Sequence, residues 1–399
     1  MLALLACAEL LGMSGWFAGS AVAPQLAERW ALNASEVGGL TTAVQLGFVG
    51  GTALSAVLNL ADIIAARRLF AMAAVAGALA NLWLAFAPSY RTALVARALC
   101  GACMAGVYPP AMKMAATWFR ARRGLAVGVI VGALTVGKAL PYLVQAVPHA
   151  TVTHIVAATS TAMLIAAALI LIGYDDGPFA FPSRPFAWHR IGDVIRARPW
   201  RLATGGYLGH MAELYSYWTW IPAFLAASSF AHGDNPATRQ LVAALSFGVI
   251  AVGGIGCVWG GVVADRIGRE RLVIGAMAAS GGCALLIGLA FGRSWWILAP
   301  LTLAWGFFVI ADSAQFSVLV TESVPPHAVG TALTLQTSVG FLLTTLTIQL
   351  VPILERRWGW AWTFPLLAIG PLLGIQAIRQ LVALKAGPAA EPSPSARLR

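Results

Sequence analysis

Runs of roughly 20 apolar residues recur along the whole chain, and they limit its possible folds more than any other feature. A helix that crosses a membrane needs a run of this length, because each residue adds only about 1.5 Å. Only 10% of the 399 residues are charged, whereas about 25% are charged in a typical soluble domain. A removable signal peptide cannot explain runs that recur, and the start MLALLACAEL lacks basic residues. The chain is therefore predicted to be an all-α polytopic membrane protein.

The sequence predicts twelve membrane-spanning helices separated by loops. Turn-forming pairs mark several loops, among them Pro88 with Ser89 and Pro325 with Pro326. The predicted spans lie at about residues 3–24, 37–60, 69–88, 92–115, 124–146, 152–173, 202–227, 240–263, 272–292, 295–319, 329–351 and 361–384.

The longest predicted loop divides the spans into two sets of six. It contains FAWHRIGDVIRARPWRL, a mixture of apolar and basic residues that is typical of a short helix in the membrane interface. We therefore expect a six-helix bundle over residues 1–173 and a linker over 174–201. A second six-helix bundle is expected over 202–384, followed by a disordered tail over 385–399.

The basic residues indicate how the chain is oriented. If the N-terminus is cytoplasmic, the even-numbered loops and the tail are cytoplasmic too, and they contain most of the 26 lysines and arginines. An excess of these residues is typical of cytoplasmic loops. The preference for arginine and alanine is typical of a bacterial genome. We therefore expect a multi-pass protein of a bacterial inner membrane with both termini in the cytoplasm. The same loops account for the net charge of +11, so nucleic acid is not an expected partner.

A charged turn occurs once in each set of spans. GGVVADRIGRERL, from Gly260 to Leu272, lies between the eighth and ninth spans, and LNLADIIAARRL, from Leu58 to Leu69, lies between the second and third. Asp62 corresponds to Asp265. Two sets of spans with a shared turn indicate an internal repeat, as in many secondary transporters.

The later turn resembles the G-x-L-A-D-R-x-G-R-K/R element of the major facilitator superfamily. The first copy departs from that element at Leu58, Ile63 and Ala65, and Arg97 to Gly101 resembles the family's R-x-x-x-G element. The resemblance implies two pseudo-symmetric six-helix halves that transport by alternating access. It also implies that the turns latch the halves together, through Gly261, Asp265, Arg266, Gly268, Arg269 and Arg271, with Asp62, Arg67 and Arg68 in the first copy. The alternative is that the turns are only topological signals.

Ionisable residues also occur inside the predicted spans, where each charge costs about 2.5–3.5 kcal/mol even on lenient scales. The resemblance places spans 1, 4, 7 and 10 at the centre of the molecule, flanked by spans 2, 5, 8 and 11. Spans 3, 6, 9 and 12 hold no charged residue in their central parts, and Arg379 lies near the end of span 12. The intramembrane ionisable residues of the other spans are Glu9, Arg97, Lys113, Lys138, His210, Glu213 and Asp312. Lys113 lies close enough to a span end for its side chain to reach the interface.

These residues suggest a division of roles. Lys138, with Arg97, is expected to attract an anionic group of a substrate. Glu213 and His210, with Asp312 and Glu9, are expected to exchange protons. The alternative for Lys138 is a plain ion pair with an acid of the other half. The further expected substrate-binding residues are aromatic or amide side chains near the same depth: Trp16, Tyr142, Tyr215, Trp218, Gln315 and Gln336.

No cofactor or metal is expected. His210 with one carboxylate offers too few ligands for zinc, and Cys100 with Cys103 forms a CxxC inside an apolar run with no second such pair. The sequence contains no G-x-x-x-x-G-K-[ST] loop for ATP. We expect neither an enzyme nor a pump driven by nucleotide.

The predicted function is proton-coupled transport of a small organic or inorganic anion by a monomer in the lipid bilayer. The alternative is a proton-driven efflux antiporter for drugs or metabolites. Drug antiporters of the family carry G-x-x-x-G-P-x-x-G-G in span 5, whereas this chain lacks that proline and has Lys138 after Gly137. Nitrate itself is disfavoured, because span 2 lacks the arginine that nitrate carriers of the family use.

Overall fold

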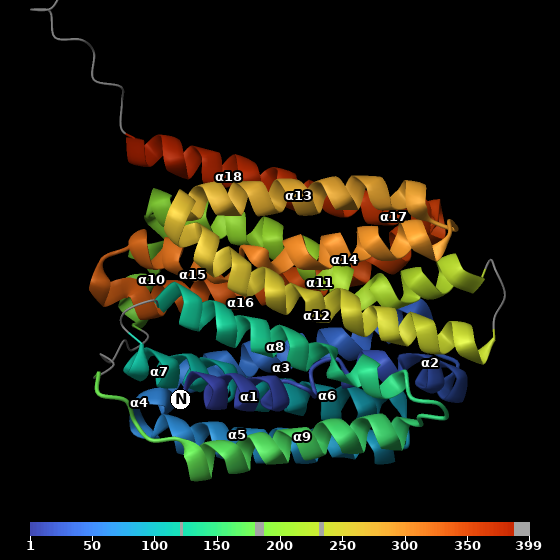
Figure 1. Cartoon of the computed structure of the whole chain (residues 1–399). Helices are drawn as coiled ribbons and strands as arrows, with labels where there is room; N and C mark the ends of the chain where they lie inside the picture. The colour runs from blue at the N-terminus through green and yellow to red at the C-terminus, as the bar shows by residue number, and fades with distance from the viewer. Residues whose placement is uncertain (120–122, 180–186, 231–234, 387–399) are drawn as a thin grey trace, which may run out of the picture.

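The computed structural model describes residues 1–119, 123–179, 187–230 and 235–386, except for the side chains at positions 61, 62, 123 and 230. All regular secondary structure in these ranges is helical (Figure 1). The first part of the chain forms α1 Leu2–Gly12, α2 Ala18–Trp30, α3 Ala34–Val57, α4 Leu60–Ile63, α5 Ala66–Trp83, η1 Leu84–Phe86, α6 Tyr90–Met104, α7 Tyr108–Trp118, α8 Arg123–Gln145 and α9 Val152–Gly173.

A short helical segment links this part to the rest. It consists of η2 Trp188–Arg190 and α10 Ile191–Arg196. The second part forms α11 Arg198–Phe230, α12 Pro236–Ile267, α13 Arg269–Ala290, α14 Trp295–Ala311, α15 Ser313–Glu322, η3 Pro326–Ala328, α16 Val329–Trp358, α17 Trp360–Thr363, η4 Phe364–Ala368 and α18 Ile369–Ala386. Residues 180–186 of the predicted linker and 387–399 of the predicted tail lie outside the described residues.

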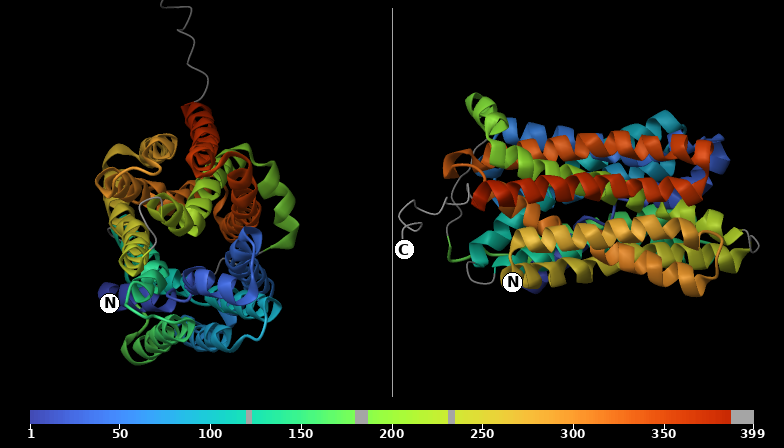
Figure 2. Two further views of the ribbon diagram at one scale, coloured as in Figure 1. Left: turned by 90° about the vertical axis from the view of Figure 1, so that its right-hand side faces the viewer. Right: turned by 90° about the horizontal axis from the view of Figure 1, so that it is seen from above.

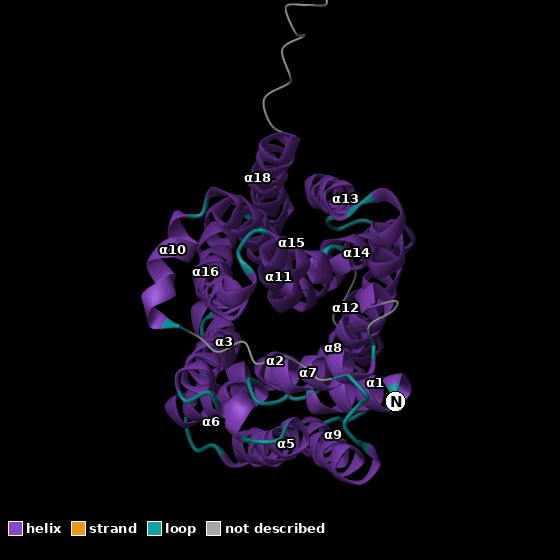
Figure 3. Cartoon of the chain, turned by 90° about the vertical axis from the view of Figure 1, so that its left-hand side faces the viewer, coloured by secondary structure: helices purple, strands orange, loops and turns teal. Residues whose placement is uncertain are grey.

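The helices form two bundles that lie side by side. In Figure 1, α1–α9 fill the lower part and α11–α18 the upper part, and the left view in Figure 2 shows the same division. The N-terminus, α10 and the end of α18 lie at one end, here called the terminal end. The α2–α3 and α16–α17 connections lie at the other, here called the distal end. Seen from the terminal end in Figure 3, the bundles meet where α8 lies beside α12 and α3 beside α16.

The contact between α8 and α12 depends on glycine. A Cβ added to Gly132 would lie 2.6 Å from the carbonyl oxygen of Gly254, and one added to Gly128 would lie 2.9 Å from that of Cys257. The two backbones therefore touch without intervening side chains, which is how small residues bring membrane helices together. This seam joins the two bundles.

The helices have the length and the surface of membrane spans. Ten helical segments within the described residues are long and apolar enough to cross a membrane. The two predicted spans that fall short of this are the first, which is split into α1 and α2, and α11, which carries many polar residues. Large apolar side chains face outward, such as Ile172 (88% exposed) and Leu289 (75% exposed). A surface of this kind suits lipid better than water.

Three of the predicted spans contain a break that the sequence analysis did not predict. Residues 13–17 separate α1 from α2, residues 105–107 separate α6 from α7, and Asp312 separates α14 from α15. Pro109 and Pro110 follow the second break and cannot donate the backbone hydrogen bonds of a continuous helix. Irregular backbone at membrane depth occurs where protein surrounds it, so the breaks point to the interior of the molecule.

Candidate functional site

Lys138 lies between the two bundles, inside a cage of aromatic rings. Its Nζ donates a hydrogen bond of 2.7 Å to the hydroxyl of Tyr215 on α11, so the contact crosses from one bundle to the other. The same Nζ lies 4.0 Å from the ring centroid of Trp16, 5.1 Å from that of Tyr215 and 5.6 Å from that of Trp218. The side chain is only 4% exposed. Ring faces attract a cation at these distances, and they hold the ammonium group in place.

No acid pairs with this lysine. Among the described residues, none of the ion pairs includes Lys138. Within the described ranges, the structure therefore does not show the alternative expected from the sequence, a salt bridge from Lys138 to an acid of the other half. The positive charge is held by one hydroxyl group and by ring faces.

Further rings extend the cage towards α3 and α16. Phe48 lies 5.3 Å from Trp16 between ring centroids, and Phe341 lies 4.8 Å from Phe48. On the other side, Phe17 lies 6.1 Å from Trp218. The sequence analysis did not select Phe48 or Phe341, because phenylalanine in a span is usually a packing residue.

Two buried donors of the cage have no partner among the described side chains. They are the indole nitrogens of Trp16 and Trp218. The amide nitrogen of Gln336 on α16 is also buried without such a partner, and Tyr142 is buried beside Phe17. Gln45 on α3, which the sequence analysis did not select, adds another unpaired amide nitrogen. Gln315 is also buried, on α15. Buried polar groups are normally hydrogen-bonded, so these donors suggest a site for a ligand with acceptor atoms.

Glu9 lies close to Lys138 and is unpaired. A Cβ added to Gly137 would lie 2.1 Å from the carbonyl oxygen of Leu10, so α8 touches α1 at this point. Gly137 is next to Lys138 in the sequence, and Leu10 is next to Glu9. Glu9 is fully buried, and neither carboxylate oxygen has a hydrogen-bond partner in the described part of the chain. The contact between α1 and α8 therefore places Glu9 and Lys138 on neighbouring segments of the first bundle.

Glu213 is buried inside the second bundle, where other side chains donate hydrogen bonds to its carboxylate. Its carboxylate accepts a hydrogen bond of 2.9 Å from Ser280 on α13 and one of 2.8 Å from the indole of Trp305 on α14. Tyr215, two residues further along α11, reaches Lys138, and residues two apart point in different directions from a helix. The structure therefore does not bring Glu213 and Lys138 together.

His210 and Asp312 form a buried ionisable pair in the same bundle. The Nδ1 of His210 lies 2.9 Å from the Oδ1 of Asp312, and both residues are 1% exposed. Asp312 occupies the break between α14 and α15, while Nε2 of His210 has no partner within the described ranges. In that part of the chain, no three His, Cys, Asp or Glu side chains are placed to hold a metal ion.

Arg97 binds the segment that interrupts the first span, between α1 and α2. Its guanidinium donates to the carbonyl oxygens of Gly15 at 2.9 Å and Trp16 at 2.5 Å, and to the Oδ1 of Asn81 at 2.9 Å. These carbonyls belong to the turn between α1 and α2. Asn81 also donates to Thr159 at 2.9 Å, which ties the turn to α5 and α9. The sequence analysis missed Asn81, although a lone amide inside an apolar run was a usable signal.

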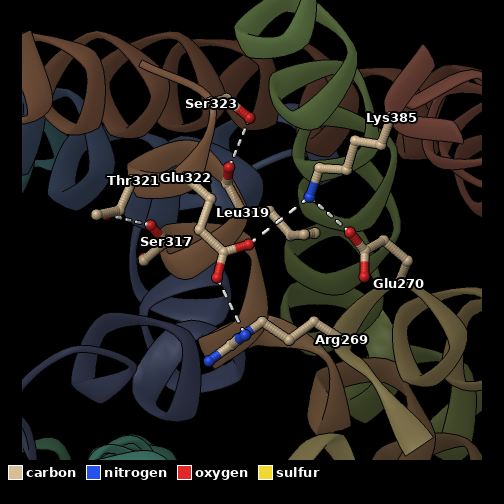
Figure 4. A network of polar contacts seen from close by, with 8 residues as sticks. All are labelled: Arg269, Glu270, Ser317, Leu319, Thr321, Glu322, Ser323 and Lys385. Carbon is tan, nitrogen blue, oxygen red and sulfur yellow. Dashed lines mark hydrogen bonds and ion pairs between the residues drawn. The ribbon is translucent and has the colours of Figure 1, made fainter. Parts of the chain in front are cut away.

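The charged turn of the second bundle joins three helix ends (Figure 4). Arg269 pairs with Glu322 at 3.0 Å, and Lys385 pairs with Glu322 at 3.6 Å and with Glu270 at 2.7 Å. Gly268 precedes α13 at φ 93°, a conformation that favours glycine. These ion pairs connect α13, α15 and α18 of one bundle, so they do not latch the bundles to each other. Glu322 and Lys385 were not predicted, because they lie far from the turn in sequence.

Asp265 is the residue of this turn that faces the first bundle. A Cβ added to Gly124 would lie 3.0 Å from its Oδ2, and one added to Gly261 would lie 2.9 Å from the carbonyl oxygen of Gly124. Gly124 belongs to the first turn of α8, where the helix dipole favours a negative charge. Arg266 and Arg271 are exposed to solvent.

In the first copy of the turn, Arg67 lies 3.9 Å from Asp175, and both side chains are largely exposed. Arg68 is exposed. The side chain of Asp62 lies outside the described residues. An exposed pair of this kind contributes little to stability.

Comparison with known families agrees with this arrangement. The family model described as Major Facilitator Superfamily matches residues 4–348, which include nearly all of the first bundle and most of the second. A search of curated proteins gave no match.

Proposed function

The chain belongs to the Major Facilitator Superfamily, and we propose that it couples proton movement to the transport of a small anion. As a member of this family it is a multi-pass membrane protein and a secondary transporter of a small-molecule substrate, not an enzyme. The substrate class and the coupling ion are the parts that we propose.

The observation that carries the proposal is the unpaired charge of Lys138. A buried ammonium group is costly without a counter-charge, and here its partners are a hydroxyl group and ring faces contributed by both bundles. An anion bound at this point would supply the missing counter-charge. It would also contact both bundles, as alternating access around a central site requires.

Glu9 supports coupling to protons. While Glu9 is ionised, its charge competes with an anion for Lys138. Once Glu9 binds a proton, only the substrate anion interacts with the charge of Lys138. The proton and the anion therefore bind together and are released together. Glu213, with His210 and Asp312, is a second proposed proton-exchange group, separated from the lysine and linked to it through α11.

Contacts between the bundles at the distal end suggest which side is closed. Ser35 on α3 donates to Gln349 on α16 at 2.6 Å, and Gln349 donates to Thr42 at 3.2 Å. Since the basic loops lie at the terminal end, we propose that this end faces the cytoplasm of a bacterium. The distal end then faces outward and is closed in this state. We also propose that the transporter functions as a monomer.

The cage itself favours a second candidate function. The ring faces that surround Lys138 would suit an organic cation if the lysine moved aside, with Glu9 as its counter-charge. This is the arrangement expected of a proton-driven efflux antiporter.

Thermal unfolding of the purified protein with added ligands distinguishes the two candidates. We expect carboxylates or inorganic anions to stabilise the wild type, by about 2.7 kcal/mol at a hundred times the dissociation constant. Lys138→Ala should lose this effect, whereas Lys385→Ala, which removes the same charge elsewhere, should keep it. Stabilisation by lipophilic cations that disappears in Glu9→Gln or Glu213→Gln would instead establish the efflux antiporter.

Uptake into liposomes tests the coupling. An inward proton gradient should accelerate anion uptake by the wild type. Glu9→Gln should still bind the anion but should no longer respond to the gradient. If Glu9→Gln keeps the gradient response and Glu213→Gln loses it, the proton is carried in the second bundle.

A further inference from the structure

We infer that the anion is a monocarboxylate with a flat, aromatic or conjugated body. The inference rests on the proposed function and narrows its substrate class. It follows from the buried donors, the number of available cations and the walls of the site between the bundles.

The unpaired polar atoms of the cage rings are donors, whereas the two unpaired carboxylate oxygens of Glu9 are acceptors. Trp16 and Trp218 each present an indole N–H that is buried without a partner in the described ranges. Together with the Nζ of Lys138, these groups would donate hydrogen bonds to the oxygens of an anion bound beside the cage. A carboxylate has two oxygens and only accepts hydrogen bonds when it is ionised, and hydrogen bonds to a charged acceptor are the strong ones.

The site offers one positive charge for this purpose. The guanidinium of Arg97 is already engaged by two backbone carbonyls and by Asn81. Glu9 adds a negative charge when it is ionised. One available ammonium group balances a monoanion, whereas a dianion would leave a buried charge unpaired, which is costly.

The walls of the site are rings rather than polar groups. Trp16, Phe48 and Phe341 meet at centroid distances of 4.8–5.8 Å, and Tyr215 lies 5.2 Å from Phe341. A flat body can stack against such faces or meet their edges, which favours it over a saturated body of equal size. A small inorganic anion would use the donors and leave the ring faces without a partner.

Isothermal titration of the purified protein with four probes tests the inference. The probes are benzoate, cyclohexanecarboxylate, nitrate and benzyltrimethylammonium. Benzoate should bind roughly threefold to tenfold more tightly than cyclohexanecarboxylate, because a stacked aromatic pair contributes about 0.5–1.5 kcal/mol. Nitrate should bind more weakly than both carboxylates.

Two tryptophan variants locate the site. Trp218→Phe keeps a ring but removes the indole N–H, so benzoate should bind roughly tenfold to a hundredfold more weakly, as expected for a lost hydrogen bond to a charged group. Trp296→Phe makes the same change at a side chain that is 89% exposed, and it should leave benzoate binding unaltered.

The outcomes separate this inference from the proposed function. Equal affinity for benzoate and cyclohexanecarboxylate, or preference for nitrate, would overturn the flat monocarboxylate while anion transport stands, provided that Lys138→Met abolishes binding. Unaltered benzoate affinity in Trp218→Phe would overturn the assignment of the donors. Binding of benzyltrimethylammonium alone would overturn both the inference and the anion transporter.

Discussion

The two basic residues buried in the first bundle, Arg97 and Lys138, differ in what surrounds them. Arg97 binds carbonyl oxygens of its own bundle, which a broken helix leaves without intrahelical partners. Lys138 reaches a hydroxyl and ring faces of the other bundle. The first arrangement suits a structural role and the second suits a ligand.

Replacement of Arg97 tests this distinction. Arg97→Gln should lower the free energy of unfolding by at least about 1.5–3 kcal/mol, the contribution of one hydrogen bond to a charged group. The thermal unfolding midpoint in detergent measures the change. Arg91→Gln, at an exposed position on the same helix, is the matched control. If Arg97→Gln is as stable as the control and loses anion binding, the arginine is a substrate ligand, as the sequence suggested.

At the scale of elements, the sequence predicted most helices but not their interruptions. The apolar runs fix where helices cross a membrane, because the length of a run is a local property. The break at residues 13–17 is bound by Arg97, which is itself bound by Asn81, and the ring of His210 lies beside Asp312 at another break. The candidate site could be predicted only in part, because the sequence shows local features but not contacts between distant residues. A buried charge such as Lys138 stands out in the sequence, whereas its ring partners Phe48 and Phe341 become visible only in three dimensions.

The glycine seam between α8 and α12 makes a prediction at this scale. Gly132→Ala would place a methyl group against the backbone of α12, so it should destabilise the protein by about 1–3 kcal/mol, as overpacking does, and should slow transport. Gly275→Ala makes the same change on α13, where nothing lies within 4 Å of the added Cβ. That control should be unchanged or more stable by about 0.5–1 kcal/mol. Wild-type stability and transport in Gly132→Ala would show that the helices do not meet as closely as described here.

For the molecule as a whole, the distal contacts imply that the bundles separate there during transport. Ser35→Cys with Gln349→Cys should be joined by a short thiol-specific cross-linker, because the native side chains touch at 2.6 Å. Cross-linking should abolish uptake, and reductive cleavage should restore it. Each single cysteine variant, treated with the same reagent, is the control. Full uptake by the cross-linked protein would mean that the distal end need not open.

One residue of the broken first span takes part in two structures at once. The carbonyl oxygen of Trp16 is bound by Arg97, and its indole ring faces Lys138. A solute that displaces the ring would therefore strain the break at residues 13–17, which Arg97 of α6 and Asn81 of α5 hold in place. Substrate binding and the stability of the break between α1 and α2 both depend on Trp16, so neither can be altered without the other. Anyone who redesigns the substrate preference at Trp16 should expect the melting temperature of the protein to change with it.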